Sequence, residues 1–210
     1  VVLEPSCASV FRDELLGLLP GRDDARSLQR QTLVLSEFLA RHVVPESIPR
    51  LARKAVAQAH CHHKSVLRFD DERGVFRAMG LDCEVLDTGC CGMAGAFGFA
   101  RETHDVAQAC GERALLPAVR ACDDTTLVLA DGFSCRNQIE QGTDRRALHL
   151  AQVLDMALTP QESGDPGPHP ESALARRHDA AIRRSMVRAG LGVLVTALVA
   201  AGVFWWSRRR

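Results

Sequence analysis

The sequence predicts an α/β fold: a mostly parallel sheet or sheets with helices on both faces, followed by one C-terminal transmembrane helix. Short β-prone runs alternate with helix-like stretches over residues 1–158, a pattern typical of parallel strands joined by helical connections. Each β-prone run is followed by a turn and a cysteine. A long uncharged run near the C-terminal end predicts the membrane helix.

The β-prone runs are "VVLEPSC", "KAVAQAHC", "CEVLDTGCC" and "TTLVLADGFSC", which end at Cys7, Cys61, Cys90 with Cys91, and Cys135. Helix-like stretches separate and follow them at 11–19, 27–40, 65–79, 104–121 and 136–156. In open parallel sheets, ligands bind beyond the carboxyl ends of the strands. We therefore expect all five cysteines to gather at that edge of the sheet, in one site.

The C-terminal part divides into three segments by composition. Residues 159–172, "TPQESGDPGPHPES", are rich in proline and predict a flexible linker. Residues 173–188 are rich in arginine and predict a juxtamembrane segment, whereas residues 189–206 carry no charge and predict the transmembrane helix. A buried amphipathic helix is the alternative, but the run offers no polar face. The uncharged run predicts a single-pass C-terminal anchor, which we expect in a bacterial inner membrane, and the arginine bias predicts that the globular part lies in the cytoplasm.

The charge balance argues against nucleic acid as a partner. The 210 residues include 26 basic and 26 acidic side chains, so no net field attracts a polyelectrolyte. Eight cysteines lie in apolar α/β-like sequence without a signal peptide, which favours reduced, metal-binding or redox thiols over disulfides. The chain starts at Val1, within a run that already reads as a strand. We therefore expect an N-terminally truncated portion of a longer protein.

The cysteines expected at the sheet edge predict a metal centre. Thiolates bind soft or borderline metals, here zinc or the iron of an iron–sulfur cluster. The intervals between Cys7, Cys61 and Cys90 are far longer than those of local C-x2-C pairs, so the fold must bring the ligands together. Glycines around the cysteine pair, Gly92 among them, leave backbone N–H groups free to bond sulfur.

The motif "AHCHHKS" surrounds Cys61 with histidines. We expect His60 and His62 to serve the metal centre as hydrogen-bond donors, as a proton relay or as a replacement ligand. The alternative is that one histidine caps the following helix and the others are exposed.

Three further cysteines, Cys83, Cys110 and Cys122, open a strand or have apolar neighbours, and we interpret them as structural. A nucleophilic Cys61 paired with a histidine would leave the adjacent thiols of "CC" unexplained. The stretch "GCCGMAGAFG" lacks both the dinucleotide-binding glycine pattern and the lysine of a phosphate-binding loop. These classes of site are therefore disfavoured.

Four motifs together resemble one family: "EPSC", "AHCHHKS", "TGCCGMAGAFGF" and "ADGFSCRNQIEQGTDRRALHLAQVL". They are similar to the cysteine-rich CCG domain of iron–sulfur oxidoreductases. The resemblance covers about residues 1–158 and is closest to the C-terminal part of FAD-linked oxidases of the D-lactate and D-2-hydroxyglutarate dehydrogenase type. More distant similarity extends to iron–sulfur components of glycolate oxidase, anaerobic glycerol-3-phosphate dehydrogenase and heterodisulfide reductase.

The resemblance implies an electron-transfer function. A flavin would oxidise a 2-hydroxy acid, and an iron–sulfur cluster of the 4Fe–4S or a non-cubane type would pass electrons towards a quinone or another acceptor. FAD is expected on an upstream domain or a flavoprotein partner, so the chain is not expected to be active alone. The cluster-associated cysteines would be Cys61, Cys90, Cys91 and Cys135, with Cys7 as a further cysteine.

One departure from the family pattern leaves the cluster type open. The heterodisulfide reductase pattern ends in C-x-x-C, whereas Cys135 is followed by Arg136, Asn137 and Gln138. A zinc-binding structural or docking module, anchored to the membrane, is the alternative function.

Overall fold

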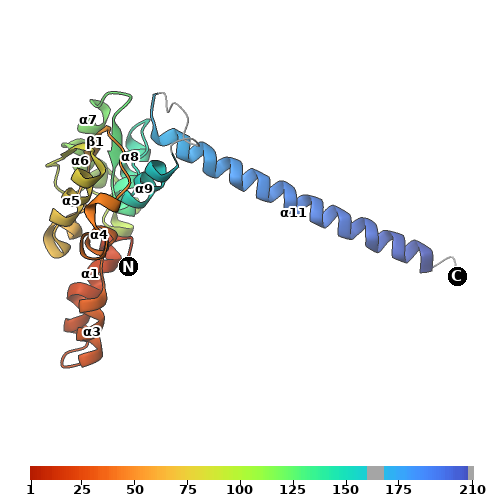
Figure 1. Ribbon diagram of the computed structural model, residues 1–210, viewed down its shortest axis with the longest axis horizontal. Coiled ribbons are helices and arrows are strands. Elements are labelled where there is room, and N and C mark those ends of the chain that lie inside the picture. Colours follow the sequence, from red (N-terminus) through yellow and green to blue (C-terminus); the bar gives the residue numbers. More distant parts are fainter. Residues whose placement is uncertain (160–167, 208–210) are drawn as a thin grey trace. The chain divides into compact units, whose positions relative to one another are not determined.

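The computed structural model describes residues 1–159 and 168–207, without the side chains of 175, 178 and 193–207 (Figure 1). The chain forms two compact units, Val1–Ser172 and Ala173–Arg210. Most of the expected linker, residues 160–167, lies outside the described residues.

A small parallel sheet organises the first unit. Its strands are β1 (Lys54–Ala57), β2 (Asp82–Val85) and β3 (Leu127–Leu129), in the order β2-β1-β3. Both pairings are parallel, with Ala55 of β1 opposite Cys83 of β2 and Leu127 of β3. β3 is fully buried and β1 nearly so, whereas β2 is an edge strand whose residues alternate between exposed and half-buried.

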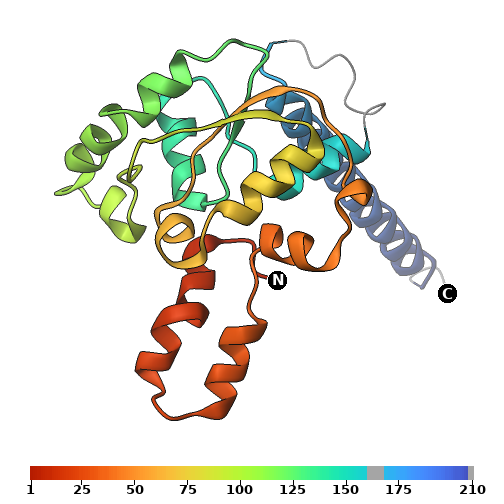
Figure 2. The same cartoon turned by 60° about the vertical axis from the view of Figure 1, so that its left-hand side comes forward.

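The N-terminal residues form a helical hairpin, and the strand expected there is wrong. The hairpin consists of α1 (Pro5–Ser9), the π-helical turn η1 (Val10–Glu14), α2 (Leu15–Leu18) and α3 (Asp23–Gln31). Figure 2 shows its two arms side by side. Proline is favoured in the first turn of a helix, and the Glu4 side chain caps α1 by accepting from Ser6 N. Only Val2 keeps strand-like pairing, in an isolated parallel bridge with Val34.

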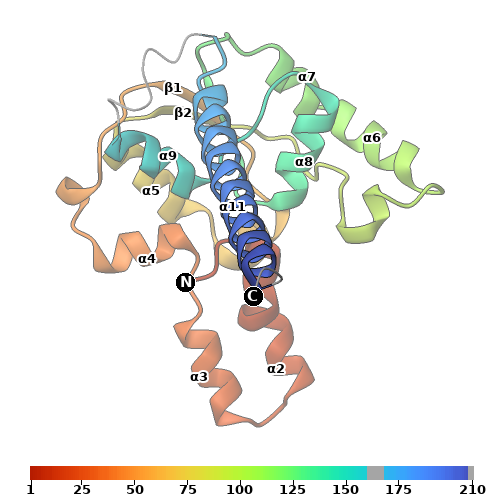
Figure 3. The ribbon, with the colours of Figure 1, turned by 90° about the vertical axis from the view of Figure 1, so that its right-hand side faces the viewer.

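Two groups of helices flank the sheet. The first group is α4 (Leu35–His42), α5 (Asp70–Met79) and α9 (Leu150–Leu158). The second group is α6 (His104–Glu112), α7 (Leu115–Arg120) and α8 (Phe133–Gly142). Helix α4 packs against α5 and α9, and α8 packs against α6 and α7. Figure 3 shows α5 and α9 on one side of the labelled strands, with α6, α7 and α8 on the other. Short 3-10 turns lie at η2 (Pro45–Ser47) and η4 (Gly95–Gly98).

Helix α5 illustrates how the local sequence places a buried group. Asp70, Asp71 and Glu72 occupy its first turn, where carboxylates interact favourably with the N-terminal end of the helix dipole. Gly80 ends the helix in the left-handed region, at φ +76°. The inward face consists of Glu72, Val75, Phe76 and Met79.

Several of the expected helices are each divided by a break with a physical cause. The chain is extended at Val34 because it bridges the N-terminal segment. Arg68, at φ +67°, separates the π-helical turn η3 (His63–Leu67) from α5. Pro117 cannot donate a backbone hydrogen bond, so α6 does not continue into α7. Leu148 exchanges backbone hydrogen bonds with the β3 segment, which separates α8 from α9.

These elements correct the expected fold class. The first unit is mostly helical α/β with a small three-stranded parallel sheet, rather than a mostly parallel sheet built from four β-prone runs. The reason is that the first run is recruited into a helix and the other strands span only three or four residues.

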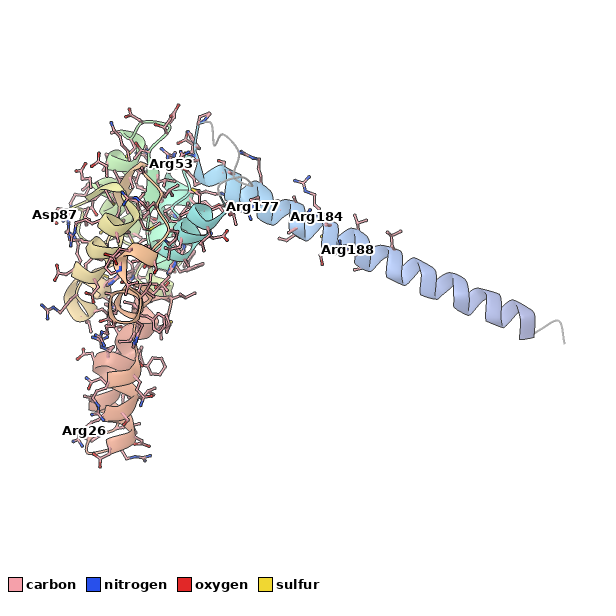
Figure 4. All side chains as sticks on the ribbon, viewed as in Figure 1. Arg26, Arg53, Asp87, Arg177, Arg184 and Arg188 are labelled. Carbon is pink, nitrogen blue, oxygen red and sulfur yellow. The ribbon has the colours of Figure 1, made fainter. Side chains whose placement is uncertain are left out.

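Helix α11 (Glu171–Ser207) corrects the expected membrane anchor. Within the part of the chain that the structure describes, no helix is both long enough and apolar enough to cross a membrane. The described side chains of this helix include several charges, at Arg176, Arg177, Asp179, Arg183, Arg184 and Arg188; Figure 4 labels three of the arginines along it. The membrane helix expected at 189–206, its juxtamembrane segment and the inner-membrane location are corrected accordingly.

Candidate metal centre

Four of the five predicted cysteines lie on segments that follow the three strands. Cys61 begins a helical turn after β1, and Cys90 and Cys91 lie in the loop after β2. Cys135 lies in the first turn of α8, after β3. Because the strands are parallel, the segments that follow them leave the sheet at the same edge. We call these four cysteines the thiol edge.

Cys91 and Cys135 form the buried half of the thiol edge. Their exposed fractions are 4% and 2%, and both belong to the hydrophobic core beside Val56, Val128 and Ile139. A hydrogen bond with Cys135 lowers the pKa of Cys91 to about 7. The same hydrogen bond, together with burial, raises the pKa of Cys135 well above its ordinary value. The pair therefore holds a single negative charge readily and a second one only at high pH.

Cys61 and Cys90 form the exposed half. Burial, followed by the charges of Cys90 and Cys91, raises the pKa of Cys61. The charges of Cys61 and Cys90 also contribute to the raised pKa of Cys135. Such mutual effects require thiols that lie near one another. The four side chains therefore form one group, with one buried and one exposed side.

The backbone at Gly92 approaches both the thiols and α6. Its N–H donates to Cys90 Sγ at 3.4 Å. Its φ of +93° lies in the region that favours glycine, and an added methyl group would overlap the Ala107 carbonyl oxygen. The backbone conformation and the lack of space for a side chain both require glycine at this position. Its backbone N–H donates to the Cys90 sulfur.

The two histidines predicted to serve the centre have different surroundings. His60 is buried and packs against Gly132, where an added methyl group would overlap the imidazole ring. His62 N donates to His60 Nδ1 at 3.2 Å, and burial lowers the pKa of His60. The His62 ring lies 3.4 Å from Ser9 Oγ. The described hydrogen-bond partners of the two imidazole rings are a backbone N–H and the Ser9 hydroxyl group. A role for either histidine at a metal stays a prediction.

Cys7 lies beside the thiol edge on an element that the sequence did not predict. It is exposed on α1, which packs against η3, the turn that follows Cys61. The Phe133 backbone N–H donates to Glu4 Oε2 at 2.6 Å, which ties the start of α1 to the start of α8.

The three cysteines interpreted as structural divide into two cases. Cys83 lies in β2, and burial raises its pKa to about 12. Cys122 is half-buried, and its thiol donates to Ala118 O at 3.2 Å. Cys110 is exposed on α6, so the expectation of burial fails there.

Sequence reasoning missed the tightest group of potential ligands. His63, Glu72 and Asp131 are buried, and their ligand atoms lie within 4.8 Å of one another. Two signals pointed to this edge, because Asp131 comes shortly after β3 and His63 belongs to the histidine-rich motif. Glu72 gave no such signal, since nothing in its local pattern distinguishes it from the neighbouring acidic residues of α5.

The chain is similar in sequence to parts of dehydrogenases. The chain is 28% identical over 156 residues to D-2-hydroxyglutarate dehydrogenase of Pseudomonas putida, covering 73% of this chain and 15% of that protein. The enzyme of the same name from Pantoea ananatis is 27% identical over 165 residues, with the same coverage of 73% and 15%. One subunit of the anaerobic glycerol-3-phosphate dehydrogenase of Escherichia coli is 38% identical over 81 residues, covering 38% of the chain and 19% of that protein.

The chain therefore spans less than a fifth of the length of these relatives. No protein-family profile matches it, and no solved structure matches it either. The relatives are dehydrogenases or part of a dehydrogenase, which supports the expected resemblance at the level of oxidoreductase components.

Proposed function

We propose that this chain is an iron–sulfur-binding, electron-transferring part of a flavin-dependent 2-hydroxy-acid dehydrogenase. The observation that carries the proposal is the thiol edge, where four cysteines follow three parallel strands and leave the sheet at one edge. The similarity to two D-2-hydroxyglutarate dehydrogenases supports the class of reaction. We assign the function to the cysteine-rich domain expected at residues 1–158.

The donor set fits an iron–sulfur cluster. Thiolates suit clusters and zinc, whereas magnesium and calcium prefer oxygen ligands. The residues that would hold the cluster are Cys61, Cys90, Cys91 and Cys135, with Cys7 as a further candidate. A bound cluster would supply a one-electron carrier. The Gly92 N–H donates to the Cys90 sulfur, and such a donor stabilises charge on the sulfur and favours the reduced state of the centre.

The burial of the thiol edge suits exchange of electrons with a partner. Cys61 and Cys90 are exposed, so a centre held there lies close to the protein surface. Cys91 and Cys135 close the opposite side with core residues and exclude water. We place FAD on a further domain or a flavoprotein partner, since the alignments leave most of each relative uncovered.

The test is anaerobic purification of the full chain with analysis of iron, acid-labile sulfide and the EPR spectrum. We expect iron and sulfide in the wild-type chain, and a large loss of both in Cys91→Ser and Cys135→Ser. Cys83→Ser is the matched control, because Cys83 lies in β2 outside the thiol edge, and it should keep its iron.

Stoichiometric zinc without iron or sulfide would contradict the proposal and favour the zinc-binding structural module. Equal iron loss in Cys83→Ser and Cys91→Ser would also contradict it, because the loss would then follow from general destabilisation. Circular dichroism of each variant shows whether the chain remains folded.

A further inference from the structure

The buried group of His63, Glu72 and Asp131 joins three elements next to the thiol edge. His63 lies in η3, Glu72 in the first turn of α5, and Asp131 in the segment between β3 and α8. Their exposed fractions are 0%, 3% and 6%. One ligand atom from each lies within 4.8 Å of the other two. An imidazole and two carboxylates thus converge in the interior of the first unit.

Polar atoms without hydrogen-bond partners concentrate in this group. Among the described residues, the buried side-chain nitrogens and oxygens that lack a partner are Ser36 Oγ, His63 Nδ1, His63 Nε2 and Glu72 Oε2. His63 Nδ1 and Glu72 Oε2 face each other at 3.4 Å without hydrogen-bond geometry. Native proteins satisfy nearly all such atoms, so a concentration of them around one point indicates a missing ligand.

A neighbouring backbone group holds the Asp131 carboxylate in position, as is common for carboxylate ligands of metals. Its Oδ1 accepts from the Leu150 backbone N–H at 2.8 Å, and His149 Nε2 lies 3.6 Å from the same oxygen. His149 is itself fixed, since its Nδ1 accepts from Ala151 N and its Nε2 donates to Leu3 O. An outer hydrogen bond such as the one from the Leu150 backbone holds a ligand in position and tunes its basicity.

Two carboxyl groups and one imidazole converge here in a dry interior, with polar atoms that lack hydrogen-bond partners. A divalent cation would bind both carboxylates at once and would occupy these atoms of His63 and Glu72.

We infer that His63, Glu72 and Asp131 bind a divalent first-row transition metal ion through one imidazole nitrogen and two carboxylates. Nitrogen and oxygen donors distinguish this site from the thiol edge, and the inference is independent of the proposed electron-transfer function. The ion would hold η3 and the β3–α8 segment together. Because Cys61 lies two residues before His63 and Cys135 lies four residues after Asp131, the ion would also help to position two thiols.

Cobalt is the probe that separates this site from the cysteines. Co²⁺ with nitrogen and oxygen ligands shows weak visible d–d bands, whereas a thiolate ligand adds an intense sulfur-to-cobalt charge-transfer band. The ligands are buried, so the ion must enter as the chain folds. The full chain is therefore produced in cobalt-supplemented minimal medium, and cobalt per chain is measured together with the absorption spectrum.

We expect the wild-type chain to hold about one cobalt more than either ligand variant, and the difference spectrum to show d–d bands without sulfur charge transfer. Glu72→Gln and Asp131→Asn should each lose this cobalt while circular dichroism shows a folded chain. Glu84→Gln is the matched control on exposed strand β2 and should retain it. The unfolding temperature of the wild-type chain should fall after chelation, whereas that of Glu72→Gln should not change.

Three results would overturn the inference: wild-type chain without cobalt, cobalt seen only through a sulfur charge-transfer band, or full retention in both ligand variants. The first is expected if a water molecule or a proton shared between the carboxyl groups satisfies these atoms. The cobalt content and absorption spectrum of the wild-type chain test the inference even if a variant fails to fold.

Discussion

At position 92 the side chain is excluded for two separate reasons. The backbone is left-handed there, and the Ala107 carbonyl oxygen occupies the space of a methyl group. The same residue donates its N–H to Cys90 Sγ. A substitution at this position therefore disturbs both the packing against α6 and the geometry of the thiol edge.

We expect Gly92→Ala to destabilise the chain by about 2 kcal/mol or more, because backbone strain and overlap add. Thermal unfolding should register a fall of at least roughly 4 °C for a chain of this size. Gly17→Ala is the control: it lies in α2 with nothing within 4 Å of an added methyl group. It should be neutral or stabilising, and an equal loss in both variants would contradict the argument.

The pH dependence of Cys83 follows from its burial. With a pKa of about 12, the Cys83 thiolate is the minor form throughout the range in which ordinary thiols ionise. At pH 9, most cysteines of an unfolded chain are ionised, whereas only a very small fraction of Cys83 is. Alkylation of Cys83 should therefore be slow in the folded chain and still rise with pH above 9. Peptide mass spectrometry of folded and denatured samples measures this, and equal rates would contradict it.

At the scale of elements, a buried ion pair within the first unit joins Glu171 to the segment after α8. Arg145 Nε donates to Glu171 Oε1 at 2.6 Å, with exposed fractions of 3% and 1%. The same guanidinium donates to the Thr126 carbonyl oxygen. Removal of one partner from such a pair leaves an uncompensated buried charge.

Arg145→Gln should therefore lower the free energy of unfolding by about 3–5 kcal/mol. The adjacent Arg146 pairs with Glu140 at 3.0 Å, and both of these side chains are more than half exposed at 55% and 51%. Arg146→Gln should cost less than about 1 kcal/mol, as surface ion pairs do. Denaturant unfolding of the two variants measures their losses of stability. Losses of similar size would contradict the prediction.

The success of sequence reasoning also varies by element. β1, β2 and β3 could be predicted with the cysteines that follow them, because apolar runs bounded by turns are local signals. The first run failed, since Pro5 and the Glu4 cap favour a helix over the apolar strand pattern. The helix breaks at Val34 and Leu148 depend on backbone pairing with distant segments. The hydrophobic periodicity of the local sequence carries no information about such pairing.

The candidate site divides in the same way. The thiol edge could be predicted because its four cysteines follow strands in the sequence. Cys7 could not be placed, since its position depends on a helix and on the distant contact between Glu4 and Phe133. Glu72 joins His63 and Asp131 only through the tertiary packing of α5.

At the scale of the whole chain, the boundary of the first unit matters. The domain expected from sequence ends at 158, whereas the compact unit extends to Ser172 and includes Glu171. A chain that ends at 158 therefore keeps Arg145 but lacks its partner.

A chain of residues 1–172 should retain the stability of the first unit and the iron content of the full chain. A chain of residues 1–158 should be less stable by about 3–5 kcal/mol, because Arg145 is left buried and unpaired. Denaturant unfolding and iron analysis of both chains measure this. Equal stability would show that Glu171 contributes little.

The contacts of Leu3 and Glu4 have a consequence for the order in which the protein is made. They join residues 129 and 146 positions apart, from Glu4 to Phe133 and from Leu3 to His149. At the usual pace of translation, the partners emerge roughly 7–30 seconds after the N-terminal segment. Until then Cys7, Cys61 and Cys90 are thiols of an unfinished chain, open to oxidation and to stray metal ions. The proposed metal centre would therefore be filled after translation, because its site is complete only when nearly the whole first unit has left the ribosome.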